Sequence, residues 1–149
     1  MAGLTIPRPQ EENISIRNLT SLTLPINQGA IKKLTQRILK RLAASGWALG
    51  IIFLSDKEIQ ALNRRYRKRE TPTDILAFDY AGNEAELIIS LETAKRNSLT
   101  FGTSFKKELM LYIIHGILHL QGFDDTNPAA KKKMLKKQEE IFKRMTNKL

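Results

Sequence analysis

One apolar stretch, residues 109–120, constrains the fold more than any other part of the sequence. Its apolar residues lie on nearly all sides of a helix, so we expect its neighbours to bury it rather than to leave one face in water. The stretch also contains the only two histidines of the chain, His115 and His119. Four residues along a helix correspond to a rotation of about 40° and a rise of roughly 6 Å, so both imidazoles project from the same face. A buried imidazole needs a polar partner, and two buried imidazoles on one face of a helix could share the same partner.

A metal ion is the partner that the next residues favour. Gly122 permits a left-handed turn, and Asp125 is then the first side chain well placed to approach the two histidines. Two imidazoles four residues apart on a helix can ligate one ion, and three protein ligands with an open position are typical of a catalytic zinc. The alternative is that both histidines are hydrogen-bonded core or surface groups, since a single HxxxH pattern is a weak signal.

The sequence argues against a peptidase and against thiolate ligands. The offsets of the glycine and the acidic residue match the metalloprotease pattern HExxHxxGxxH, but Gly116 stands where that pattern has its general base. The chain has no cysteine, so disulfides are excluded and a metal must use histidine and carboxylate.

Charge indicates the class of partner. The 149 residues contain 25 Lys and Arg against 15 Asp and Glu, a net charge of +10, which favours a polyanion; a well-solvated basic surface is the alternative. We expect a single domain over residues 1–149, in the cytoplasm, because no apolar run is long enough to span a membrane and no signal peptide is apparent. Fifteen of the 25 basic residues fall in three sets, Arg64, Arg65, Arg67, Lys68 and Arg69; Lys131, Lys132, Lys133, Lys136 and Lys137; and Lys32, Lys33, Arg37, Lys40 and Arg41.

Hydrophobic periodicity predicts an α+β domain with a mixed sheet of about four strands, five or so helices, and the metal site on the buried helix and the turn after it. Capping residues place the helix starts at Ser55, Ser90, Ser104 and Asn127. We expect Tyr66 to point inward, and we expect Met134, Ile141 and Met145 to be buried by the last helix. The predicted strands are 13–19, 47–54, 74–79 and 84–90, and the predicted helices are 27–45, one from Ser55, one from Ser90 through Arg96, one from Ser104 and one from Asn127.

Three blocks of the sequence together resemble one family. The segment HGILHLQGFDD at 115–125 is similar to the signature HGxLHLxGYDH of the YbeY family of bacterial metal-dependent endoribonucleases. Residues 62–67 and 73–78 resemble its LNxxYR and TDVLSF segments, and residues 87–92 match its IVISLE segment. The blocks stand in the order of the family, and the resemblance covers roughly residues 45–145.

The resemblance implies a single-strand-specific endoribonuclease of ribosomal RNA processing, including 16S rRNA 3′-end maturation, and of ribosome quality control. His115 and His119 match the first two metal ligands, and Arg67 matches the arginine regarded as functionally important, so Arg67, His115 and His119 are the expected catalytic residues. The expected cofactor is one divalent ion, zinc by resemblance, held by His115, His119 and Asp125. The implied partners are single-stranded RNA, ribosomal RNA, the small ribosomal subunit, ribosomal proteins and a GTPase, with no membrane.

Departures from the family pattern leave some of this open. Asp125 replaces the third histidine ligand, which leaves the metal preference open, and Asp124 remains an alternative third ligand. Phe123 replaces a tyrosine, and Ala77, Phe78 and Asp79 stand where the family has Ser-Phe-Pro. Rival functions are a ribosome-associated RNA-binding protein with a structural metal, a metal-dependent hydrolase of another substrate, and a non-haem iron oxygenase using two histidines and one carboxylate.

Overall fold

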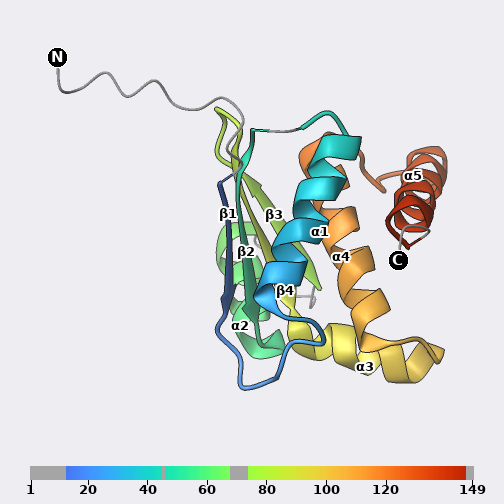
Figure 1. The fold of residues 1–149 in the computed structure, drawn as a ribbon. Helices are drawn as coiled ribbons and strands as arrows, with labels where there is room; N and C mark the ends of the chain where they lie inside the picture. The colour runs from blue at the N-terminus through green and yellow to red at the C-terminus, as the bar shows by residue number, and fades with distance from the viewer. Residues whose placement is uncertain (1–12, 45, 68–73, 147–149) are drawn as a thin grey trace, which may run out of the picture.

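Four strands form one mixed sheet in the order β1-β2-β4-β3 (Figure 1). The structure is a computed structural model that describes residues 13–44, 46–67 and 74–146. Strands β1 (Asn13–Asn18), β2 (Ala48–Leu54) and β4 (Glu84–Ser90) run parallel, and β3 (Ile75–Asp79) is antiparallel to β4. The predicted mixed sheet of about four strands is therefore confirmed, and β3 lies at one edge of it.

Helices pack against both faces of this sheet. The described residues form five helices, α1 (Gln28–Arg41), α2 (Asp56–Arg67), α3 (Leu91–Phe101), α4 (Phe105–Leu120) and α5 (Pro128–Thr146). Alternate residues of β4 show the two faces: Leu87 and Ile89 belong to the large core under α1 and α4, whereas Ile88 packs with Ile59 of α2. Helix α2 lies on the opposite side of the sheet from α1, and α5 lies outside α4 (Figure 1).

Helix α4 is the buried helix that the sequence predicts. Leu109, Ile113, Ile114 and Leu118 have no exposed surface. Gly116 lies against the sheet, where an added Cβ would come within 2.8 Å of the Leu87 Cδ2 atom. The position that holds the protease glutamate thus faces the core, and a side chain there could not reach a site on the histidine side of the helix.

The predicted helix starts are confirmed by their capping bonds. The Ser104 side chain accepts a hydrogen bond from the Lys107 amide at 3.0 Å, and the Asn127 side chain accepts from the Ala130 amide at 2.8 Å. At α2, the Ser55 hydroxyl accepts from the Glu58 amide at 3.2 Å, as a capping box requires. Met134, Ile141 and Met145 of α5 are buried as expected.

Other details of the sequence-based prediction are wrong. Helix α1 ends at Arg41 and not at residue 45, because Ala43 takes a positive φ of 55° ahead of the expected stop at Gly46. Helix α3 continues past Arg96 to Phe101, where Gly102 with φ 66° ends it. Tyr66 does not point inward: 59% of it is exposed.

Asp56 ties the start of α2 to the start of α3. Its carboxylate accepts hydrogen bonds from the hydroxyls of Ser90 and Thr93 and from the guanidinium of Arg96, while its amide donates to Glu92 at 2.9 Å. Burial raises the pKa of Asp56, but these hydrogen bonds and the charge of Arg96 outweigh burial and hold the pKa below its ordinary value. The contact fixes α2 and α3 at one end of the sheet.

No helix in the described part of the chain combines the length and apolar character needed to cross a membrane.

Candidate metal centre

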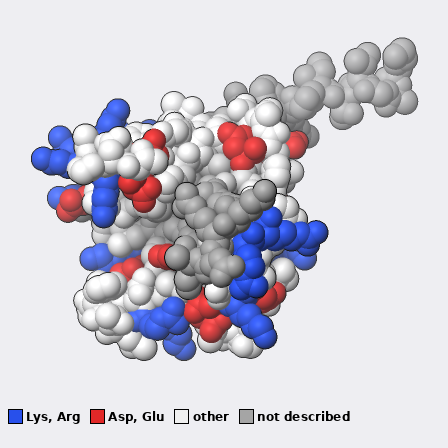
Figure 2. All heavy atoms as spheres, turned by 180° about the vertical axis from the view of Figure 1, so that it is seen from behind, with Lys and Arg blue, Asp and Glu red and all other residues white. Residues whose placement is uncertain are grey.

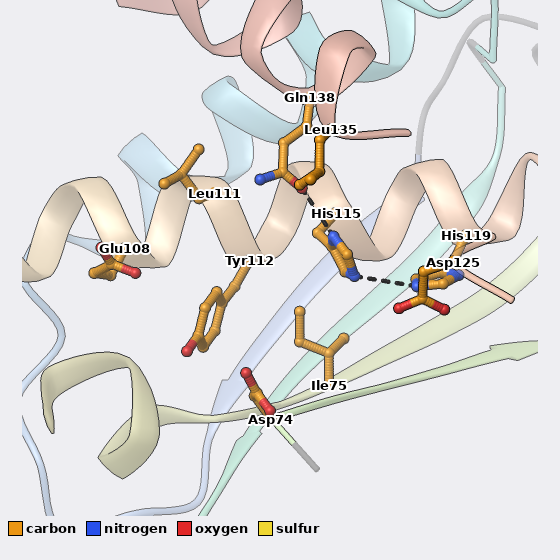
Figure 3. A pocket seen from close by; sticks show the side chains of 10 residues that line it. All are labelled: Asp74, Ile75, Glu108, Leu111, Tyr112, His115, His119, Asp125, Leu135 and Gln138. Atoms are coloured by element: carbon orange, nitrogen blue, oxygen red, sulfur yellow. Dashed lines mark hydrogen bonds between the residues drawn. The ribbon is translucent and has the colours of Figure 1, made fainter. Parts of the chain in front are cut away.

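The two histidines of α4 face each other at the surface of the core (Figure 3). Their Nε2 atoms are 3.1 Å apart, and the ring planes are inclined by 78°. Both side chains are half-buried. The predicted one-turn spacing therefore brings one ring nitrogen from each histidine to the same point.

Gln138 of α5 sets the orientation of His115. The Gln138 Oε1 atom lies 2.8 Å from the Nδ1 atom of His115. Since an amide oxygen only accepts, Nδ1 is the nitrogen that carries the proton. Nε2 then presents its lone pair towards His119, which is the state that a metal ligand requires.

The turn after α4 brings an acidic residue back to the histidines. The Gly122 amide donates to the His119 carbonyl at 3.0 Å and the Phe123 amide donates to the Leu118 carbonyl at 3.1 Å, which is the Schellman pattern. Gly122 has φ 95°, in the left-handed region that glycine adopts without strain.

The two aspartates after this turn have different surroundings. The Asp124 Oδ1 atom accepts hydrogen bonds from the amide and the hydroxyl of Thr126, at 3.2 and 2.8 Å. These bonds hold the pKa of Asp124 below its ordinary value. Asp125, in contrast, offers a carboxylate oxygen to the histidine pair.

His115, His119 and Asp125 each offer one ligand atom, and these atoms all lie within 4.8 Å of one another. Two imidazole nitrogens and one carboxylate oxygen form a donor set that suits a divalent transition metal and leaves coordination positions open. The residues present therefore fit one such ion.

An open cavity of about 470 Å³ extends from the three residues along α4 (Figure 3). Asp74, at the start of β3, and Tyr112 stand at the side away from His119. The Asn97 side chain donates to the Tyr112 hydroxyl at 2.5 Å. Burial, with the charge of Asp74, raises the pKa of Tyr112 far above its ordinary value. The cavity is thus wide enough for a substrate group, and its far wall carries a neutral phenol. Its lining residues are Asp74, Ile75, Glu108, Leu111, Tyr112, His115, His119, Asp125, Leu135 and Gln138.

Two further residues bear on the sequence-based site. Arg67 is the last residue of α2, and its side chain lies outside the described part of the structure, as do Lys68 and Arg69, so their relation to the histidines stays a prediction. Gln138 was not among the site residues predicted from the sequence; its bond to His115 spans 23 residues, and no local sequence pattern signals it.

Comparisons with known proteins identify relatives across most of the chain. The sequence profile of the family described as Endoribonuclease YbeY matches residues 15–146. A protein of that name from Treponema denticola is 34% identical over 128 residues, covering 78% of this chain and 83% of the relative. One from Bacteroides fragilis is 46% identical over 89 residues, covering 58% and 64%. The solution structure of TM1509 from Thermotoga maritima superposes with a TM-score of 0.61 at 27% identity, covering 91% of this chain and 90% of that one. The chain therefore belongs to the endoribonuclease YbeY family.

Proposed function

We propose that the protein is a metal-dependent endoribonuclease that cuts single-stranded RNA during ribosomal RNA processing. The observation that carries this proposal is the convergence of His115, His119 and Asp125, within 4.8 Å, at one end of an open cavity. Its family membership supports RNA as the substrate. A net charge of +10 is consistent with a polyanionic substrate.

His115, His119 and Asp125 would hold one divalent ion, with zinc as the expected metal. When bound, such an ion supplies a Lewis acid for a phosphate oxygen and lowers the pKa of a coordinated water. Gln138 keeps the proton of His115 on Nδ1, so that Nε2 stays available as a ligand. The Asp125 carboxylate lowers the net charge of the site compared with three imidazoles, which favours tolerance of manganese or magnesium beside zinc.

Arg67 would stabilise the charge that develops on the phosphoryl oxygens, because a guanidinium is always charged and can donate two parallel hydrogen bonds. Arg67, His115 and His119 are the residues to which we assign catalysis. Either a water molecule or the 2′-hydroxyl of the RNA would supply the attacking oxygen.

The biological setting that we propose is 16S rRNA 3′-end maturation and ribosome quality control in the cytoplasm. Its partners would be ribosomal RNA and the small ribosomal subunit, with ribosomal proteins and a GTPase as further candidates.

Cleavage of a labelled single-stranded RNA tests the activity. We expect the wild type to cut it, a chelator to stop the reaction, and added zinc or manganese to restore it. A His115→Ala/His119→Ala variant should be inactive, whereas Lys106→Ala, on the exposed side of the same helix, should cut normally. Arg67→Ala should lose cleavage while keeping its fold by circular dichroism. RNA binding without chelator-sensitive cleavage would instead favour the binding protein with a structural metal.

A further inference from the structure

Three aromatic rings lie in a row at the rim of the sheet face that α2 covers. We call them the aromatic ladder: Tyr66, Phe78 and Tyr80. The ring centroids of Tyr66 and Phe78 are 6.0 Å apart, and those of Phe78 and Tyr80 are 6.4 Å apart with planes inclined by only 7°. The two outer rings are 59% and 54% exposed. Aromatic side chains stabilise a fold when they are buried, so two open tyrosine rings in contact with a half-buried phenylalanine indicate a contact surface.

The tyrosine rings of the ladder are exposed because α2 no longer covers the sheet at the end of β3. Leu62 still packs in the small cluster with Leu76 and Ile88. One helical turn later, Tyr66 contacts Phe78 with the two ring planes inclined by 78°. Phe78 and Tyr80 are two residues apart and so lie on the same side of the chain. Among the strands of the described residues, β3 has a neighbour on one side only and forms an edge of the sheet.

Opposite charges stand at the two ends of the ladder. At the Tyr66 end, the guanidinium carbon of Arg65 lies 5.5 Å from the ring centroid, and Arg64 is exposed. At the other end, the Tyr80 hydroxyl donates to the Glu86 carboxylate at 2.6 Å, which fixes the ring and raises the pKa of Tyr80 to about 12. Figure 2 shows the molecule from the side on which α2 lies: blue side chains gather towards the right of this view, and red side chains lie above and below them. An anionic backbone would therefore lie at the arginine end.

We propose that the aromatic ladder stacks bases of single-stranded RNA while Arg64 and Arg65 contact its backbone phosphates, a proposal that rests on the proposed function. Proteins that bind single strands combine aromatic rings for bases with cations for phosphates, and both are present here. Paired bases cannot expose their faces in this way, so the ladder selects unpaired RNA. Strand β3 lies between the ladder and the cavity. Ile75 lines the cavity on the α4 side of the sheet, whereas Phe78, about 10 Å further along, packs on the α2 side, so bound RNA would pass around the edge strand β3 from one to the other.

Binding of a fluorescein-labelled single-stranded oligoribonucleotide, in chelator to prevent cleavage, tests the proposal. Tyr66→Leu and Tyr80→Leu should each raise the Kd about tenfold, as expected for loss of one stacked base. Tyr66→Phe and Tyr80→Phe keep the rings and should stay within about twofold of the wild type. Phe101→Leu is the matched control, because Phe101 is a 69% exposed aromatic residue of α3 outside the ladder.

The same variants are measured with a duplex of the same sequence, and they should all bind it like the wild type. Wild-type affinity of both leucine variants for single strands would overturn the proposal. Equal losses for duplex and single strand would overturn it as well, since stacking would not then be the cause. A change in sedimentation coefficient rather than in RNA affinity would assign the ladder to contacts between copies of the chain. Cleavage assays separate this result from the proposed function: cleavage with an unaffected Kd refutes only the ladder, and a raised Kd without metal-dependent cleavage refutes only the nuclease.

Discussion

Substitution of Gly116 by alanine tests how closely α4 approaches the sheet beneath the histidines. The new Cβ would lie 2.8 Å from Cδ2 and 3.0 Å from Cδ1 of Leu87, a fully buried residue. Overpacking of this kind costs about 1–3 kcal/mol. Alanine in place of glycine within a helix returns about 1 kcal/mol. We therefore expect a net loss of about 0–2 kcal/mol in the free energy of unfolding.

A double-mutant cycle isolates the steric part of this effect. Leu87→Val removes both δ-methyl groups and leaves an ordinary contact, because Cγ of Leu87 is 3.4 Å from the added Cβ. In that background, Gly116→Ala should stabilise the protein by about 1 kcal/mol, through helix propensity alone. The coupling between the two sites should then be about 1–3 kcal/mol. Urea denaturation in chelator gives the free energy of unfolding of all four proteins. In thermal unfolding of the same proteins, each change of 1 kcal/mol should move Tm by about 2–4 °C. An equal effect of Gly116→Ala in both backgrounds would refute the close approach.

Three further predictions follow from the contacts described. Gln138→Leu should weaken metal binding about 10- to 100-fold in a titration against a competing chelator. Gln121→Leu, which loses a bond to the Leu42 carbonyl and none to a histidine of the site among the described contacts, should bind metal normally. Because the pKa of Asp56 is lowered on folding, its stabilising effect is present above its ordinary pKa of 3.8 and disappears as the pH falls through the lower folded value. Asp56→Asn should therefore lower the free energy of unfolding by about 1–2 kcal/mol at pH 7, and equal stability of the two proteins at neutral pH would contradict this. Asp125→His restores a third neutral ligand, so the rate–pH profile should shift to lower pH and zinc should tighten relative to manganese; superimposable curves would mean that Asp125 does not contact the ion.

Local signals predicted the parts of the fold that depend on neighbouring residues. Ser104 and Asn127 each cap a helix, because their side-chain oxygens accept a hydrogen bond from the amide three residues later. Such a contact is local, so the residue type and its position in the sequence are enough to predict it. The end of α1 was not predictable in this way, since alanine at position 43 adopts a positive φ that its type does not signal. Tyr66 follows the helical period of α2 yet lies beyond the surface that the sheet can bury.

In the candidate site, too, the features set by neighbouring residues were predictable and those set by tertiary contacts were not. The spacing of His115 and His119 and the turn at Gly122 were visible in the sequence, because helix geometry and the conformational freedom of glycine fix them. Gln138 approaches His115 only because α5 packs on α4, and Asp74 reaches the cavity only because β3 lies at the edge of the sheet beside α4. Such contacts depend on the tertiary fold and leave no periodic signature.

Metal content per chain, measured for the neighbouring variants Asp125→Asn and Asp124→Asn, tests the central claim most directly. The two substitutions remove the same charge from adjacent residues, but only Asp125 belongs to the group of ligand atoms within 4.8 Å. After loading with zinc and gel filtration, elemental analysis should find one ion per chain in the wild type and in Asp124→Asn. Asp125→Asn and the His115→Ala/His119→Ala variant should contain far less. Equal zinc in the wild type and the double histidine variant would contradict the account, and loss of zinc in Asp124→Asn alone would show that the third ligand is misassigned.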